Sequence, residues 1–258
     1  MPYPAKLTSQ DRDKRRTKSE RQMIRVWRDY LSMVKSDVIH GVRVSHFAIS
    51  IDPRQIAFWE HEFTKFLKLY GAIILDIYFD GLDEGIGLLK PEVQLIVDWD
   101  LINQDAANYL RNYSTSWLRT IEKYTRDETV KTMDIWMKSG APLPDLIKML
   151  EPIYGKDRAE RIAVTETTRL YADANQDAWQ STGFISTNVW RTANDDKVCP
   201  ICAPLEGMEV NIGQNEFTDT PGEMGITGPP AHVNCRCALF PGDVQEQGFR
   251  EALRKQLG

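Results

Sequence analysis

Cysteine and histidine are both scarce in this chain of 258 residues, with four of each. The longest apolar run, near residues 71–79, contains Asp76 and falls well short of the roughly 20 residues that span a bilayer. The first residues, Met1 to Lys6, lack the basic and apolar regions of a signal peptide. We therefore expect a protein that is made and folded in the cytoplasm, where thiols stay reduced, and that has no membrane partner.

Catalytic signatures are also missing. The sequence has no Gly-x-Ser-x-Gly, no glycine-rich phosphate loop and no His-Glu-x-x-His. Three of the histidines, His40, His46 and His61, are isolated, and we interpret them as structural or exposed. We predict that the chain has no catalytic residues and is not an enzyme.

Charge is unevenly distributed along the chain. The whole sequence has a formal net charge of −5, whereas residues 1–35 hold ten Lys and Arg against four Asp and Glu, a net +6. The remainder therefore carries −11. A basic arm on an acidic body favours separate partners for the two parts. The basic side chains that we expect to contact an anionic partner are Lys14, Arg15, Arg16, Lys18 and Arg21.

Apolar spacing predicts a mainly α-helical protein with a small β-containing region near the C-terminus, an α+β arrangement. An extended link or strand is expected over residues 40–51, and Asp52 is the expected N-cap of a helix ended by Gly81, Gly85 and Gly87. The expected helices cover about 8–36, 52–79, 101–112, 114–139, 144–153, 156–182 and 245–256, and the expected strands 186–192, 207–210 and 235–240.

The four cysteines form two close pairs within 39 residues, Cys199-x-x-Cys202 and Cys235-x-Cys237, and His232 precedes the second pair. Cys-x-x-Cys turns two sulfurs toward one point, and residues 235 and 237 share one face of a strand. We predict a structural zinc site held by the four cysteines, with His232 as a substitute or supporting ligand. Four protein ligands leave no open position for catalysis.

Other interpretations of the cysteines stay open. The four thiols can pair as disulfides, although a reducing compartment disfavours this. They can also stay reduced and pack as small hydrophobic side chains. A redox role for Cys-x-x-Cys is weakly supported, because no βαβ pattern surrounds it.

One predicted helix carries a polar stripe, in which Glu166 and Arg169 are neighbours at i, i+3 and Arg161 lies about two turns before Arg169. The stripe is either a solvated ion pair worth a few tenths of a kcal/mol or a buried network that ties the helix to the cysteine region. In the second interpretation, Asp195 and Asp196 are the partners of Arg169. A catalytic role of Glu166 as a base lacks a marked nucleophile.

Several ordered motifs share a family resemblance. They cover residues 159–171, 190–202, 205–207 and 229–237, the last with the sequence Pro-Pro-x-His-x-Asn-Cys-Arg-Cys. Together, the segment from about 99 to 241 resembles the phage Mu protein F-like family of minor head, or head morphogenesis, proteins of tailed phages. Lys90-Pro91 marks an expected domain boundary, so we expect a family domain at 91–242, preceded by a helical region with the basic arm at 1–90 and followed by a C-terminal helix at 243–258.

The resemblance also implies a role and partners. It implies a low-copy virion protein inside the capsid at the portal vertex, which aids head assembly and genome packaging or delivery. The implied partner is the portal protein, with the major capsid or scaffold protein and packaged DNA as further candidates. The basic arm is the part that we expect to dock to portal or DNA.

Two alternative functions remain in competition with this one. The first is a DNA-binding virion protein, which the basic arm favours and the acidic body opposes. The second is an injected, nuclease-like effector enzyme that would use Glu166, His232 and the metal. That enzyme needs a metal position open to water, which four-sulfur coordination excludes.

Overall fold

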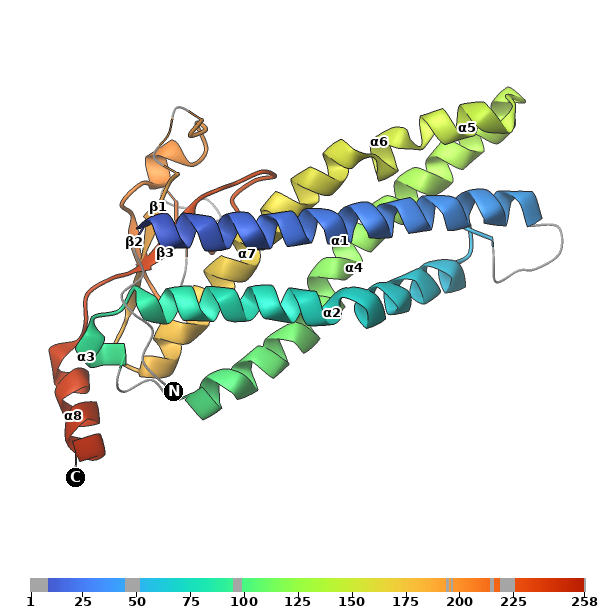
Figure 1. Cartoon of the computed structure of the whole chain (residues 1–258). Coiled ribbons are helices and arrows are strands. Elements are labelled where there is room, and N and C mark those ends of the chain that lie inside the picture. Colours follow the sequence, from blue (N-terminus) through green and yellow to red (C-terminus); the bar gives the residue numbers. More distant parts are fainter. Residues whose placement is uncertain are drawn as a thin grey trace. The chain divides into compact units, whose positions relative to one another are not determined.

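The computed structural model describes residues 9–44, 52–94, 99–193, 195, 197–213, 216–218 and 226–257. Helices dominate this part of the chain, and a small sheet lies near its C-terminus (Figure 1). The fold class expected from the sequence is therefore confirmed. The elements are α1 (Ser9–Val44), α2 (Ile56–Gly87), α3 (Pro91–Gln94), α4 (Trp99–Ser139), α5 (Leu143–Met149), α6 (Glu151–Tyr154), α7 (Lys156–Thr182), β1 (Thr187–Arg191), the 3-10 helix η2 (Ala203–Leu205), β2 (Glu209–Asn211), β3 (Ala238–Pro241) and α8 (Glu246–Leu257).

Contacts divide the chain into two compact units, each built from segments that are distant in the sequence. The first unit comprises residues 1–21, 75–107 and 164–258, and the second comprises 22–74 and 108–163. The first unit holds the sheet and every cysteine. These units are defined by contacts and do not follow the domain boundaries expected near residues 90 and 242, which stay a prediction.

The sheet has three antiparallel strands in the order β2-β1-β3, with β1 at the centre. Trp190 of β1 is fully buried, pairs with Leu239 of β3 and makes an edge-to-face contact with Phe217 at 5.1 Å between ring centroids. The sheet lies beside the first turns of α1 in Figure 1, where the Arg12 guanidinium sits 4.8 Å from the centre of the Phe240 ring. These contacts join the N-terminal turns to the cysteine-bearing segment.

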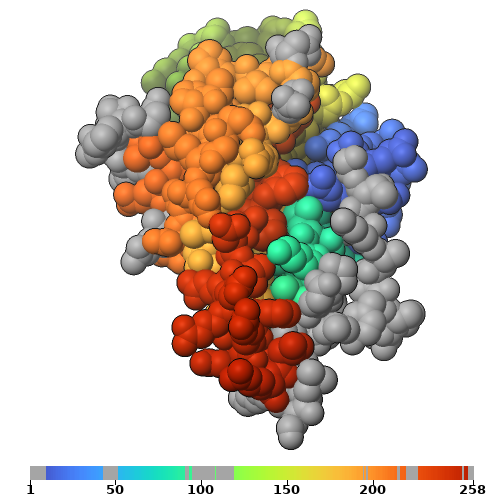
Figure 2. Space-filling model, turned by 90° about the vertical axis from the view of Figure 1, so that its left-hand side faces the viewer, coloured from blue at the N-terminus to red at the C-terminus, as the bar shows by residue number. Residues whose placement is uncertain are grey.

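The C-terminal helix α8 lies on the surface of the first unit, where it forms part of the red segment of Figure 2. Its Phe249 packs edge-to-face on Phe184, with 5.7 Å between ring centroids. The backbone N–H of Gln245 donates to the carbonyl of Phe184 at 2.8 Å and fixes the start of the helix. The chain after β3 is thus held to the end of α7.

The close approach of α2 and α7 explains why α2 continues through Gly81 and Gly85, which were predicted to end it, and ends only at Gly87. A Cβ atom at Gly81 would lie 2.9 Å from the Cβ of Ala174, and one at Gly85 would lie 2.9 Å from the Cα of Asn175. The indole N–H of Trp179 donates to the carbonyl of Gly85 at 2.8 Å. Glycine is used at these two positions because a second backbone occupies the space of a side chain. The break predicted at Gly81 and Gly85 is wrong, whereas the one predicted at Gly87 agrees with the end of α2.

Other element boundaries follow the sequence to different degrees. The expected helix at 156–182 is confirmed as α7, and the positive φ of Gly183, 73°, ends it as expected for a C-terminal glycine. The break expected at residue 113 is wrong, because α4 is one continuous helix. The extended segment expected from residue 40 is also wrong as far as Val44, which still belongs to α1, and 45–51 lie outside the described residues.

The N-cap role predicted for Asp52 is wrong, because α2 begins at Ile56, about one turn later than expected. The Asp52 carboxylate accepts a hydrogen bond from the backbone N–H of Arg54 at 3.0 Å and further ones from the Nε and Nη2 groups of the Arg54 guanidinium. Its side chain therefore organises the turn that leads into the helix.

The second unit is held by an aromatic cluster and by buried hydroxyl groups. Phe66 contacts Trp27 and Tyr30 at centroid distances of 5.0 and 4.7 Å. The hydroxyls of Thr129 and Tyr154 are hydrogen bonded at 2.6 Å. Across the described ranges, none of the helices combines the length and apolar character needed to cross a membrane.

Candidate metal centre and the neighbouring polar cavity

The two cysteine pairs and His232 meet at one place in the first unit. The backbone N–H of Cys202 donates to the Cys199 sulfur at 3.4 Å, so the turn between them folds both thiols to one side. His232 Nε2 lies 3.0 Å from Cys199 Sγ and 3.2 Å from Cys202 Sγ, and Cys202 Sγ lies 3.9 Å from Cys235 Sγ. Segments that are 30 residues or more apart thus converge on a cluster of soft ligands.

The five donors form two overlapping groups that share Cys202. Cys199, Cys202 and His232 form one group, and Cys202, Cys235 and Cys237 form the other, with ligand atoms within 4.8 Å of one another in each. A tetrahedral zinc with Zn–S bonds of about 2.3 Å separates two sulfurs by about 3.8 Å, close to the Cys202–Cys235 distance. The cluster can therefore hold a metal ion, and His232 lies as close to the sulfurs as they lie to one another.

Hydrogen bonding prepares His232 to ligate through Nε2. The Nδ1 atom lies 2.8 Å from the carbonyl oxygen of Val233, which can only accept. Nδ1 therefore carries the proton in the neutral ring, and the Nε2 lone pair faces Cys199 and Cys202. In most metal-binding histidines, a hydrogen bond from the other ring nitrogen to a backbone carbonyl or carboxylate fixes the tautomer in this way.

The thiols of the cluster differ strongly in pKa. A hydrogen bond from the Cys237 thiol, assisted by backbone N–H groups of Cys237 and Ala231, lowers the pKa of Cys235 to about 5. The donor role of Cys237 raises its own pKa. Burial raises the pKa of Cys202 to about 12. A cation at this point would replace the protons that these thiols share, because only thiolates bind metals.

Two threonines of α7 anchor the second cysteine pair. Thr165 Oγ1 accepts a hydrogen bond from the backbone N–H of Asn234 at 3.0 Å, and Thr168 Oγ1 donates to the carbonyl of Cys235 at 2.7 Å. Asn234 has a positive φ of 64°, a conformation that Asn tolerates better than most residues. The sequence did not predict that either threonine contacts the second cysteine pair, although three threonines within four residues of a helix indicate a buried polar face.

Replacing Thr168 with valine tests this anchor. The isosteric change leaves the buried Cys235 carbonyl without its donor, so we expect the free energy of unfolding to fall by about 1–2 kcal/mol. Thr167→Val is the matched control, because Thr167 is equally buried and its hydroxyl makes no hydrogen bond to the described residues. Urea denaturation of both variants measures the difference, and equal stability of the two would contradict the anchoring role.

The predicted polar network is arranged differently from the expectation. Glu166 is almost fully buried and its carboxylate lies 3.8 Å from the Nε of Arg169, so this ion pair is not on the solvated face. Asp195 instead pairs with Arg236, which lies between the two cysteines of the second pair, at 2.8 and 3.1 Å. Arg161 is exposed and belongs to the second unit, and Asp196 lies outside the described residues.

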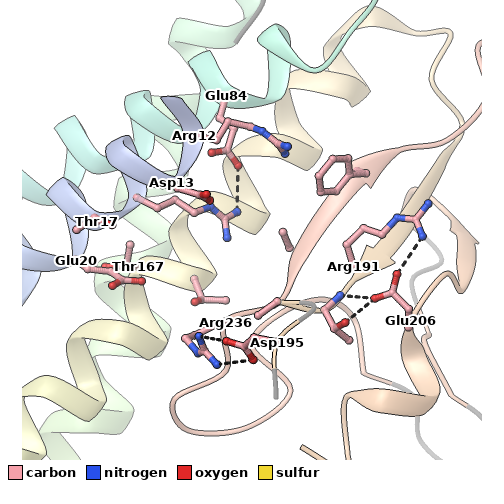
Figure 3. Close-up of a pocket in the computed structure, with 16 residues that line it drawn as sticks. Arg12, Asp13, Thr17, Glu20, Glu84, Thr167, Arg191, Asp195, Glu206 and Arg236 are labelled. Atoms are coloured by element: carbon pink, nitrogen blue, oxygen red, sulfur yellow. Dashed lines mark hydrogen bonds and ion pairs between the residues drawn. The ribbon is translucent and has the colours of Figure 1, made fainter. Parts of the chain in front are cut away.

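A polar cavity of about 790 Å³ lies next to the cysteine cluster (Figure 3). Thr168, Asp195 and Arg236 line this cavity and also surround the second cysteine pair. Three ion pairs border it, and Figure 3 shows their dashed contacts. They are Arg16–Glu84 at 3.1 Å, Arg191–Glu206 at 3.0 Å and Arg236–Asp195 at 2.8 Å. Burial raises the pKa of Glu20, against the opposing field of Arg16 and Arg236. The cavity is therefore polar but largely charge-balanced.

The predicted contact residues of the basic arm separate into two sets. Arg15 and Arg16 are paired with Asp83 and Glu84 of α2, at 3.5 and 3.1 Å. Lys14, Lys18 and Arg21 are exposed. Only this second set is available to a partner as predicted, because the first is occupied by carboxylates of the same unit.

Two of the isolated histidines, His40 and His61, belong to the second unit and are not part of the cysteine cluster. His40 and His61 are exposed and line a separate cavity of about 490 Å³ in the second unit, beside Glu62 and Lys65. His46 lies outside the described residues.

Comparison with known families agrees with the motifs. Residues 136–240 match the model of a family described as Phage Mu protein F like protein. None of the curated proteins or solved structures gives a significant match to the chain. The resemblance is confirmed over 136–240, which includes both cysteine pairs and His232, whereas the preceding residues 99–135 lie outside the match. The match supports a head morphogenesis protein of a phage.

Proposed function

Because residues 136–240 are a Phage Mu protein F-like region, we propose that the chain is a structural minor head protein of a tailed phage. It acts inside the capsid at the portal vertex and aids head assembly and genome packaging or delivery. The family match is the observation that carries the proposal. The role is structural and not enzymatic, and the partners are the portal protein and the adjoining major capsid or scaffold protein.

The metal centre serves this role as a structural zinc site. Thiolate and imidazole donors suit zinc, and three of the four sulfurs are buried. When bound, the ion would cross-link the turn after β1 to the segment that enters β3. That link supports the segment between residues 183 and 245, whose described residues form no long helix and whose small sheet alone buries little apolar surface.

Sedimentation of a phage lysate tests the proposed location. We expect the chain to migrate with portal-containing heads and proheads in a density gradient, and to stay with the portal protein after the heads are disrupted. Immunoblotting of gradient fractions measures both. Recovery of the chain only from the fractions that hold free protein would contradict the proposal.

A portal-deficient lysate provides the control for specificity. Heads that assemble without portal protein should contain none of the chain, whereas heads that lack only the tail should contain the normal amount. Equal incorporation with and without portal would assign the chain to the capsid shell and remove the portal from its partners.

A further inference from the structure

An uninterrupted basic stripe runs along one face of helix α1. Its five side chains are all exposed, and they follow one another at intervals of four, three, four and three residues. This spacing places them on one face of an α-helix, because residues three and four apart are neighbours. The stripe consists of Lys14, Lys18, Arg21, Arg25 and Arg28.

The stripe is unlike an ordinary solvated helix face. None of its side chains forms an ion pair with another described residue. Like charges at i, i+4 destabilise a helix by a few tenths of a kcal/mol each, and surface helices usually interleave acids with bases. The neighbouring Arg15 and Arg16 point elsewhere on the same helix and have carboxylate partners. Arg15 and Arg16 are therefore paired with carboxylates, whereas the five residues of the stripe are not, although the exposed Asp29 lies at i, i+4 from Arg25.

The dimensions and chemistry of the stripe fit a phosphate backbone. From residue 14 to residue 28 an α-helix rises about 21 Å, at about 1.5 Å per residue. Over that length duplex DNA carries about 12 phosphate charges, at one per roughly 1.7 Å of axis. All five residues lie on one continuous helix, α1.

We propose that this stripe, made of Lys14, Lys18, Arg21, Arg25 and Arg28, binds the phosphate backbone of double-stranded DNA without reading its sequence. An acidic protein surface is the less favoured partner, because stable protein interfaces need buried aromatic or aliphatic anchors and the stripe has none. The identification of packaged DNA as the natural ligand rests on the proposed function. Binding to DNA itself rests only on the stripe.

Salt dependence of DNA binding provides the test. The full-length, metal-loaded protein is titrated against a labelled 30-base-pair duplex of arbitrary sequence, and fluorescence anisotropy is measured between 50 and 200 mM salt. Five phosphate contacts give a slope of log K against log salt of about −4.5, which weakens binding about 500-fold over this range. A variant with all five residues replaced by glutamine should lose this binding and its salt dependence.

A matched variant separates the stripe from net charge. Five other exposed lysines, replaced together by glutamine, lower the charge by the same amount and should keep most of the affinity. They are Lys123, Lys131, Lys138, Lys148 and Lys156. Circular dichroism checks that both variants keep their helix content.

Three results would overturn the inference. They are no DNA binding by the unmodified protein at 50 mM salt, equal losses in the stripe and matched variants, and a stripe variant that keeps DNA binding but loses portal binding. The last would assign the surface to a protein partner. Failure of the virion proposal is a separate result, because a protein that binds DNA through the stripe but is missing from heads would leave this inference standing.

Discussion

Replacing Cys202 with serine is expected to release the bound metal and to lower the melting temperature by roughly 10 °C or more. Cys202 is the one donor that belongs to both ligand groups, so its loss leaves neither group complete. Structural zinc sites contribute about 10–16 kcal/mol of apparent binding free energy in small domains. Losing even a third of this free energy would destabilise the protein more than most single substitutions in a core do.

Elemental analysis and thermal melting measure this effect together. The freshly purified protein should contain about one zinc per chain, and the Cys202→Ser variant almost none. Ala203→Ser is the matched control, because it places the same hydroxyl at the exposed next residue and removes no ligand. A metal-free protein whose melting is unaffected by a chelator would contradict the zinc site altogether.

The remaining four donors allow a finer test. A four-coordinate ion that uses Cys202 takes three more ligands, and the structure offers four, namely Cys199, His232, Cys235 and Cys237. One of these four single substitutions should therefore keep the metal. Cobalt substitution of that variant shows by its charge-transfer bands whether the retained set contains three or four sulfurs.

Local patterns in the sequence are enough to predict most helices and the residues that come together in the cysteine cluster. The two cysteine pairs and His232 can be recognised because chain reversal and ligand chemistry both depend on residues close in sequence. α7 is predicted to its ends because its start and its terminal glycine, Gly183, are local signals as well. The spacing did not decide whether His232 belongs to the cluster. The geometry does, because its Nε2 atom lies close to the sulfurs of Cys199 and Cys202.

Contacts between distant segments are what the sequence could not supply. Asp195 was matched with Arg169 because both are charged and near the cysteines, yet it pairs with Arg236. Arg15 and Arg16 looked equivalent to Lys14, because their partners on α2 lie about 68 residues away. A charged residue reveals its sign in the sequence, but its partner is decided by which helices pack together.

The glycines of α2 are another case in which a contact with a distant segment could not be predicted from the sequence. Gly85 provides the second prediction with a large expected effect. Gly85→Val is expected to lower the free energy of unfolding by about 3 kcal/mol or more. A Cβ atom at Gly85 would lie 2.9 Å from the Cα of Asn175 and 3.1 Å from the Cβ of Ala178, and a backbone atom cannot move aside as a flexible side chain can. Valine adds two methyl groups to that contact.

A pair of alanine variants in the same helix isolates packing from helix propensity. A Cβ atom at Gly71 would meet no atom within 4 Å beyond the backbone of its own helix. Gly71→Ala should therefore stabilise the protein by about 0.5–1 kcal/mol, the usual preference for alanine within a helix. Gly85→Ala carries the same preference but meets the backbone of α7, so its effect should have the opposite sign. Urea denaturation of both variants measures the two signs. If Gly85→Ala also stabilised the protein, α2 and α7 would not be in backbone contact, and the glycine would be there for another reason.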